Sequence, residues 1–91
     1  MVNVLDVAAY ILQSAGDMTA MKLQKLVYYT QAWSLVWDDK PLFEEKIEAW
    51  ANGPVIRELY DAHRSRYHLT EIAGGMPNKL SENQKDSVFV I

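Results

Sequence analysis

The residues in this sequence that could perform chemistry are few, and their spacing matches no catalytic or metal-binding motif. The chain has no cysteine, which excludes disulfides, thiolate zinc sites and thiol nucleophiles. Its two histidines, His63 and His68, have Glu58, Asp61 and Glu71 near them in the sequence. Their spacing of five differs from the i, i+4 spacing that places two histidines on one face of a helix. We therefore interpret both as surface histidines and predict no metal site.

Other catalytic patterns are also missing from the sequence. Serine, histidine and aspartate all occur, but no G-x-S-x-G segment or other nucleophile motif accompanies them. The pair Gly74–Gly75 lacks the preceding strand and the immediately following helix that a phosphate-binding loop needs. The acidic pairs Asp38–Asp39 and Glu44–Glu45 fall in predicted turns, where we expect them to be solvated. These observations predict a protein that is not an enzyme and binds no cofactor.

The length and the charge restrict the function classes further. The chain has 91 residues, which is enough for one domain, and 49% of them are hydrophobic. No apolar run approaches the ~20 residues that span a membrane, and the N-terminal segment lacks the basic start of a signal peptide. We therefore expect a soluble cytoplasmic protein that does not enter a membrane. The net charge of −3 argues against a general nucleic-acid binder.

One long apolar segment, Met21 to Trp37, organises the rest of the chain. Its apolar residues recur at helical spacing and predict a helix of about four to five turns. They comprise Leu23, Leu26, Val27, Thr30, Trp33 and Trp37 on one face, flanked by Tyr29, Ala32 and Val36. A helix that is apolar nearly all round lies in the middle of a domain, so we predict that this segment dominates the core.

Only a narrow strip of this helix is polar, and we expect it to be exposed. The strip contains Lys22, Gln24, Lys25, Gln31 and Ser34, with the hydroxyl of Tyr28 nearby. The two lysines lie near the helix N-terminus, where the helix dipole disfavours a cation by a few tenths of a kcal/mol. Two interpretations stay open. The strip is either simply solvated, or it binds an acidic partner protein through Lys22, Lys25 and Tyr28, with Gln24 and Gln31 at its edges.

A second basic cluster supports an alternative function. Arg57, Arg64 and Arg66 could contact phosphates together with Lys22 and Lys25, as in a nucleic-acid-binding regulator. The net charge weighs against this alternative, so we expect nucleic acid not to be the partner.

Capping signals predict further helices around the central one. Asn3 with Asp6 forms a variant of the capping box and predicts a helix to Ser14. Gly16 is a candidate for the left-handed residue that follows this helix, and Thr19 is a candidate N-cap of the central helix. A box of Ser81 and Gln84 predicts a last helix.

The segment between these helices is harder to interpret. The apolar residues from Leu42 to Trp50 fit a helical period and also a weaker alternating one. We favour an extended stretch over residues 46–50, which would pair with residues 67–72, the one candidate partner strand. Gly53 permits a turn, and Pro54 is suited to be the first residue of a helix that ends at His63. The sequence therefore predicts a mainly α domain of about four helices with at most a short two-stranded β ribbon.

Two motifs in this chain resemble those of a known family. The first is Lys-Leu-x-Lys-Leu-x-Tyr-Tyr at the start of the central helix, and the second is Glu-Ala-Trp-x-x-Gly-Pro-Val at residues 48–55. Together they resemble the Panacea antitoxin domain, also called the SocA-like or GepA-like family of phage-associated proteins. The resemblance runs from about Asp6 to Tyr67, with a fainter continuation from Leu80 to Lys85.

The resemblance implies a mostly helical domain, of phage or prophage origin, that neutralises a partner toxin protein. Some members bind their toxin directly, and one branch delivers it to a bacterial protease, so a protease is a second candidate partner. The residues that carry the family motifs are interpreted as structural: Trp33, Trp50, Gly53, Pro54 and Tyr60. Trp50 has a functional alternative, which is to line a groove for the partner.

Family members usually continue through another helix, so we expect the single domain of residues 1–91 to be truncated at its C-terminus. The apolar residues Val88, Phe89 and Ile91 would then lie on a face that a longer chain covers. An exposed patch of this kind favours self-association.

Overall fold

The computed structural model describes residues 2–51 and 53–89, except for the side chains of residues 87 and 89. Within these residues, four helices and four short strands follow one another in the order α1 (Val4–Ala15), β1 (Met18–Thr19), α2 (Ala20–Trp37), β2 (Ile47–Trp50), β3 (Gly53–Ile56), α3 (Arg57–His63), β4 (His68–Leu69) and α4 (Glu82–Phe89). A single turn of 3-10 helix, Pro77–Lys79, precedes α4. The predicted mainly α class is confirmed.

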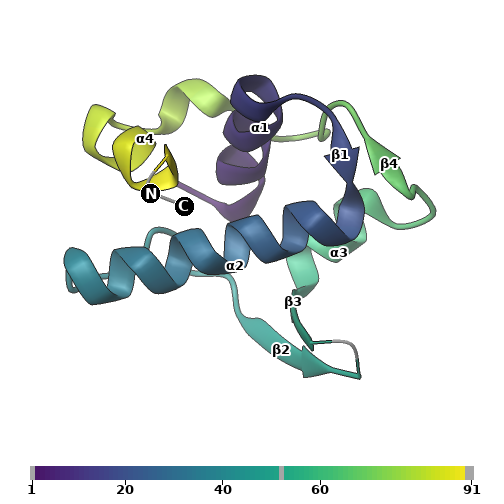
Figure 1. Ribbon diagram of the computed structural model, residues 1–91, viewed down its shortest axis with the longest axis horizontal. Coiled ribbons are helices and arrows are strands. Elements are labelled where there is room, and N and C mark those ends of the chain that lie inside the picture. Colours follow the sequence, from purple (N-terminus) through teal and green to yellow (C-terminus); the bar gives the residue numbers. More distant parts are fainter. Residues whose placement is uncertain (1, 52, 90–91) are drawn as a thin grey trace.

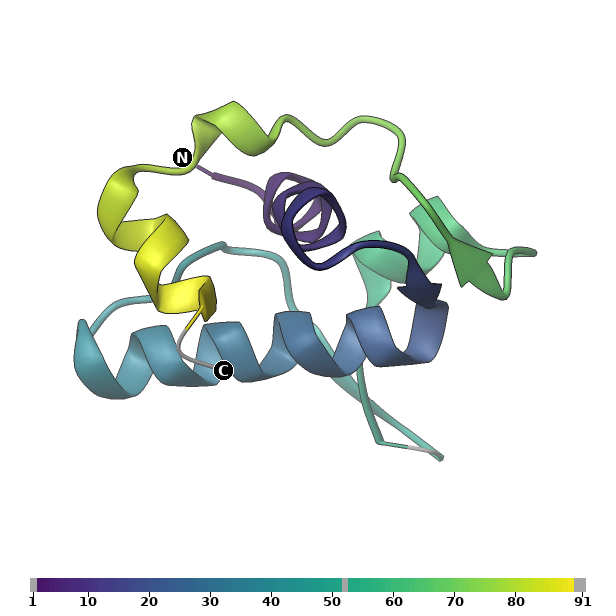
Figure 2. The ribbon, with the colours of Figure 1, turned by 45° about the horizontal axis from the view of Figure 1, so that its top comes forward.

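Helix α2 is the element on which the others assemble. It crosses the whole molecule, with α1 and α4 packed on one side and α3 at its N-terminal half (Figure 1). Seen from a second direction, the segment between β4 and α4 arches over α1, and the β2–β3 hairpin projects away from the helices (Figure 2). The hairpin is therefore attached to the body at one end, where β3 contacts α2.

The predicted starts of α1 and α2 are confirmed. Asn3 accepts from the backbone N–H of Asp6, and Asp6 accepts from that of Asn3, which completes the capping box of α1. Thr19 accepts from the backbone N–H of Lys22 and caps α2. Gly16 has a positive φ of 90°, as expected, but its ψ of −177° is extended rather than left-handed helical. These caps satisfy N–H groups that have no partner within the helix.

The core lies between α1, the inner side of α2, and α3. Its fully buried side chains are mostly aliphatic, with one phenylalanine. They include Val4, Val7, Leu23, Val27, Phe43, Ile56, Leu59 and Leu69. Helix α1 and the first half of α2 thus contribute the faces that the apolar spacing predicts, and Phe43 joins them from the loop after α2.

The loop from residue 70 to residue 80 is fastened to α1 at two points. The buried carboxylate of Asp6 accepts from the backbone N–H of Met76 at 2.8 Å. Gly75 lies so close to the backbone carbonyl of Leu5 that a Cβ atom would collide with it. Here a side chain that caps α1 also holds a loop seventy residues later in the chain.

The strand partners differ from the prediction. Residues 47–50 are a strand, but they pair with β3 in a hairpin rather than with residues 67–72. Strand β4 pairs instead with β1, so the described part of the chain contains two short antiparallel ribbons. A hairpin closes only a very short loop and loses less chain entropy than the predicted pairing, which separates its strands by about 20 residues.

The predicted first residue of the third helix is also wrong. Pro54 lies in β3, opposite Ala49, and α3 begins three residues later at Arg57. Gly53 has a φ of 119°, a conformation that side chains disfavour, at the start of β3. Proline is tolerated in a two-stranded ribbon, where one edge of the strand needs no donor.

Candidate protein-binding face

The polar residues of α2 divide into two groups that point in opposite directions. Gln24, Gln31 and Ser34 are buried, with 1%, 6% and 4% of their surface exposed. Lys22 and Lys25 are exposed. The expectation of one exposed polar strip containing Gln24, Gln31 and Ser34 is therefore wrong. Spacing alone identified the polar residues but not the fact that the chain returns over them after α2.

Gln31 and Ser34 hold the chain as it leaves α2. The side-chain carbonyl of Gln31 accepts from the N–H groups of Leu42 and Phe43, and its amide donates to the carbonyl of Phe43 at 2.8 Å. The hydroxyl of Ser34 donates to the carbonyl of Lys40 at 2.9 Å. Buried backbone groups of a loop need hydrogen-bond partners. The side chains of Gln31 and Ser34 supply the bonds that the backbone of a neighbouring strand would otherwise provide.

The side chain of Gln24 likewise bonds to backbone groups at the end of β3. Its side-chain carbonyl accepts from the N–H of Ile56 at 3.0 Å, and its amide donates to the carbonyl of Ile56 at 3.3 Å. The second bond of the amide, at 3.0 Å, goes to Nε2 of His63. Because Ile56 fixes the orientation of the amide, Nε2 of His63 must be the acceptor. His63 is therefore neutral, with its proton on Nδ1.

The two histidines have different environments. His63 is 4% exposed, so its interpretation as a surface residue is wrong. Burial lowers the pKa of His63, in agreement with its role as an acceptor. His68 is exposed as predicted, and its Nε2 lies 2.7 Å from the carboxylate of Asp17. The hydrogen bond from His68 lowers the pKa of Asp17.

Gln24 and His63 also form part of the wall of an apolar pocket of about 250 Å³. The other lining residues come from the start of α2, the hairpin and α3: Met21, Trp50, Ala51, Val55 and Tyr60. The rings of Trp50 and Tyr60 meet edge to face, with centroids 4.8 Å apart. The structure thus brings two of the predicted motif residues together with two buried polar ones, a combination that the sequence spacing did not reveal.

The indole of Trp50 is fixed in place by polar neighbours. Its Nε1 donates to Glu48 at 2.8 Å, and the guanidinium of Arg57 lies 5.9 Å from the ring centroid. Arg57 also pairs with Glu48 and Asp61. An aromatic ring held this way, with 36% of its surface exposed, forms a fixed apolar wall of the pocket.

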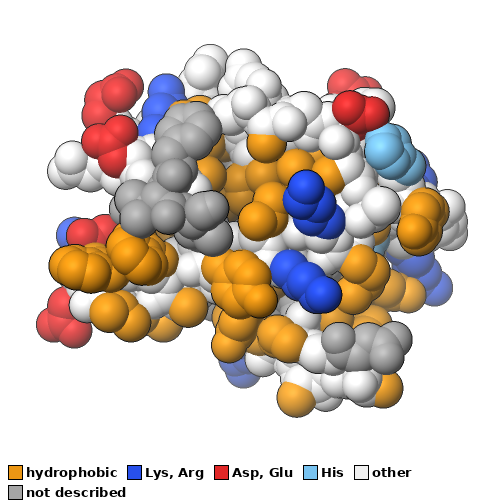
Figure 3. Space-filling model, viewed as in Figure 1, with side chains coloured by type: hydrophobic (Ala, Val, Ile, Leu, Met, Phe, Trp, Pro, Cys, Tyr) orange, Lys and Arg blue, Asp and Glu red, His pale blue; other side chains and the backbone are white. Residues whose placement is uncertain are grey.

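The outward side of α2 carries a stripe that combines cations and apolar groups. We call Lys22, Lys25, Tyr29, Trp33 and Val36 the outer face, since they succeed one another at spacings of three and four residues. Tyr29 is 50% exposed and Val36 is 77% exposed. Figure 3 shows basic side chains over the N-terminal half of α2 and hydrophobic side chains over the rest of it.

The prediction that the whole of α2 dominates the core needs correction. The C-terminal half of α2 does not dominate the core, because Leu35, Val36 and Trp37 are exposed and Trp33 is half-buried against Trp37, with ring centroids 5.2 Å apart. Tyr28 is half-buried against the core, whereas its neighbour Tyr29 points to solvent. Counting helical positions from Lys22 and Lys25 would have selected Tyr29, which is seven and four residues away.

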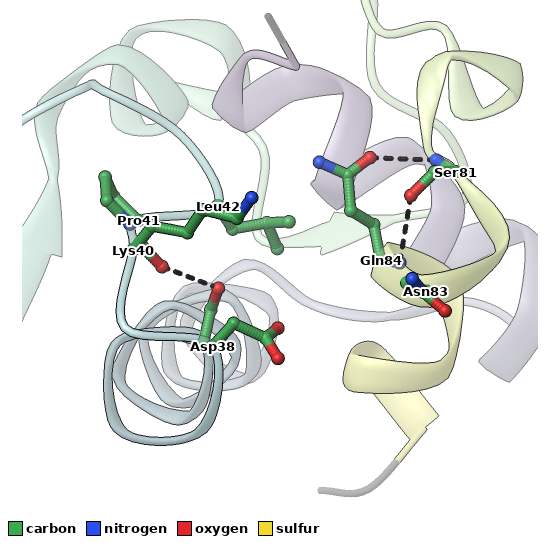
Figure 4. A pocket seen from close by; sticks show the side chains of 8 residues that line it. Asp38, Lys40, Pro41, Leu42, Ser81, Asn83 and Gln84 are labelled. Carbon is green, nitrogen blue, oxygen red and sulfur yellow. Dashed lines mark hydrogen bonds between the residues drawn. The ribbon is translucent and has the colours of Figure 1, made fainter.

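A second hollow, of about 500 Å³, lies between the C-terminal end of α2 and the start of α4 (Figure 4). Ser81 and Gln84 line it and bond to each other as the capping box of α4, which confirms the predicted helix start. Ser34 lines it too and bonds to the carbonyl of Lys40. We therefore assign this hollow to the packing of α4 on α2.

Val88 packs against the core from α4. The side chain of Phe89 and all of Ile91 lie outside the described part of the chain, as does the patch they were predicted to form.

Across residues 2–51 and 53–89, no three acidic or histidine side chains are grouped closely enough to hold a metal ion. Within the same ranges, none of the helices has the length and hydrophobicity to cross a membrane.

Comparison with known proteins identifies a family. A family model described as "Antitoxin SocA-like, Panacea domain" matches residues 23–90, about three quarters of the chain. No curated protein and no solved structure matches. The matched range includes most of α2, the hairpin and α3, and hence most of the outer face and the lining residues of the pocket except Met21.

Proposed function

The chain belongs to the SocA-like antitoxin family with the Panacea domain, and on this premise we propose that it neutralises a partner toxin protein by binding it directly. The observation that carries the proposal is the outer face of α2, where apolar side chains are exposed beside two lysines. Exposed apolar groups on a rigid helix, next to charge, are typical of protein interfaces. The proposal includes no catalytic step.

The proposed contact has two parts. The first is the outer face, with Lys22 and Lys25 toward an acidic region of the toxin and Tyr29 in the apolar centre. Tyr28 remains a candidate contact through its hydroxyl. The second is the pocket between Met21, Trp50 and Tyr60, which offers space for one apolar side chain of the toxin.

The charges of the first part have a definite expected role. Lys22 and Lys25 lie in the first turns of α2, a position that the helix dipole disfavours. A solvated surface gives no reason for this placement, but an acidic partner does. Exposed charges at an interface act mainly on the rate of association and on its salt dependence.

The source and the place of action complete the proposal. We infer a phage or prophage origin and action in the cytoplasm, both from the family resemblance. Direct binding is preferred to delivery to a protease because a preformed apolar face next to a pocket needs no third component.

The test is co-expression of the chain with the toxin-like gene beside its own. The wild type should restore growth, and the variant Lys22→Glu, Lys25→Glu, Tyr29→Ala should not. Tyr29→Ala alone should weaken binding by about 2 kcal/mol if Tyr29 is a hot spot. The matched control Lys46→Glu, Lys79→Glu changes the charge equally at exposed sites outside α2 and should protect like the wild type.

Toxin abundance separates the two antitoxin mechanisms. Direct binding predicts that the toxin level stays constant while growth is restored, whereas delivery to a protease predicts that it falls. Equal protection by the wild type and a folded outer-face variant would remove this face from the proposal. No protection by the folded wild type would contradict the function itself.

A further inference from the structure

The outer face of α2 has an unusual arrangement of charge along its length. Lys22 and Lys25 lie at its N-terminal end, and the exposed Asp39 follows its C-terminal end. The first turn contains no acidic residue, and the last turn contains no basic one. Neither turn therefore carries the charge that would stabilise the helix dipole at its end; just outside the helix, Asp17 is paired with His68, and Lys40 follows Asp38 and Asp39, which leaves the C-terminal end with a net negative charge.

A second α2 helix in antiparallel orientation would correct both ends at once. Its C-terminal end, with Asp39, would lie beside Lys22 and Lys25, and its lysines would lie beside the first helix's Asp39. The two ends are 17 residues apart, so a two-fold axis would pass near residues 30 and 31. The same rotation that pairs Lys22 with Asp39 sets Lys25 opposite Val36 and Tyr29 opposite Ala32.

The centre of such a pair is apolar and has room for close approach. Tyr29 and Val36 are exposed, whereas the neighbouring Ala32 is small and half-buried. A tyrosine ring from one copy can therefore lie over the alanine of the other. An interface that matches itself under a two-fold rotation is the commonest arrangement of soluble dimers.

We propose that the outer face of α2 binds a second copy of this chain, with the two α2 helices antiparallel. The complementary groups on both sides of the interface come from one sequence, and this selects a second copy as the occupant. The apolar residues that would otherwise remain exposed are covered, and the dimer is of the small, reversible kind because little more than one helix face is buried.

The dimer has a consequence that rests on the proposed function. Since the toxin is proposed to bind the same face, a chain in the dimer does not bind toxin, and toxin binding separates the two copies. The dimer thus keeps the apolar face covered until a toxin is present.

The test is sedimentation of the full chain from micromolar to millimolar concentration, with charge variants mixed in pairs. The wild type should dimerise reversibly. Lys22→Glu with Lys25→Glu makes both ends acidic, and Asp39→Lys makes both ends basic. Each variant alone should associate at least about tenfold more weakly than the wild type. An equimolar mixture of the two should restore dimers, because each end then meets its opposite charge.

Two controls match the charge changes. Lys46→Glu with Lys79→Glu and, separately, Glu44→Lys alter exposed residues outside α2 and should dimerise like the wild type. Circular dichroism establishes that every variant is folded, which matters for Asp39 because its φ is 56°. Val36→Lys, at a position with 77% of its surface exposed, places a cation opposite Lys25 of the second copy and should also abolish the dimer.

A wild type that stays monomeric at millimolar concentration would overturn the proposal, as would folded variants that fail to pair when mixed. The result is independent of any toxin. A dimer that behaves as described in a chain that protects against no toxin would refute the proposed function and leave the dimer standing.

Discussion

On the inner side of α2, Gln24, Gln31 and Ser34 are buried and bonded to backbone groups of the returning chain, whereas on its outer face Tyr29 and Val36 are exposed to solvent. The usual distribution, with apolar side chains buried and polar ones exposed, is thus reversed at these positions. Buried polar groups that are fully bonded fix the path of the chain, and exposed apolar groups indicate a surface that binds something else. The comparison separates the residues that stabilise this domain from those proposed to bind.

The largest effect is expected from Gln31→Leu. The change leaves the N–H groups of Leu42 and Phe43 and the carbonyl of Phe43 without their side-chain partner. Unpaired buried groups of this kind should lower the free energy of unfolding by about 2–4 kcal/mol. Urea denaturation measures the change, with the exposed Gln13→Leu as the matched control. An unchanged urea midpoint would show that the inner side does not stabilise the fold.

A smaller effect is expected from Trp33→Ala. Full burial would make this change cost about 3–5 kcal/mol. Because Trp33 is half-buried and packs on the exposed Trp37, we expect about 1–2 kcal/mol instead. The same urea experiment decides between the two ranges. A loss of about 3–5 kcal/mol would show that Trp33 stabilises the fold as the buried residues of the inner side do.

The pH dependence of stability tests the buried bond between Gln24 and His63. The pKa of His63 is lowered from 6.5 in the folded chain, so the unfolded chain binds its proton first as the pH falls. Stability should therefore be constant well above pH 6.5 and decrease on acidification through that value, until His63 is protonated in both states. Thermal melts across this range should show the decrease in the wild type.

The two histidines provide an internal control for that experiment. His63→Leu should remove the contribution of the buried site, whereas His68→Gln should keep it, because His68 is exposed and pairs with Asp17 instead. If the decrease in stability persists in His63→Leu and disappears in His68→Gln, the pH dependence arises from His68, and the prediction for His63 is contradicted.

The smallest effect on stability is expected from Val36→Ser. Its side chain is 77% exposed, so the free energy of unfolding should change by less than about 0.5 kcal/mol. A loss of unfolding free energy as large as that of Gln31→Leu would contradict the distinction between the inner side and the outer face of α2.

The sequence was informative where a structure depends on neighbours in the chain. The caps at Asn3, Thr19 and Ser81 need partners only three residues away, and all three were predicted. The apolar spacing located α1 and α2 for the same reason. Membership of the antitoxin family also followed from two short motifs, each contained within one or two elements.

The sequence was misleading where a residue depends on distant contacts. Nothing near Gln24 in the chain reveals that Ile56 and His63 will lie against it, because these residues are more than thirty positions away. The exposure of Val36 and Trp37 has the same origin. Periodicity gives the apolar character of a helix face, but only the assembled fold decides which turns of the helix are covered.

The most direct test of the central claim is calorimetric titration of the folded chain with the toxin encoded beside it. The wild type, the outer-face variant Tyr29→Ala with Val36→Ser, and the control Lys46→Ala with Lys79→Ala should be compared at one salt concentration. We predict that the outer-face variant binds at least about tenfold more weakly than the other two, with an unchanged urea midpoint. Equal affinity for all three proteins would contradict the claim that the outer face of α2 is the binding surface.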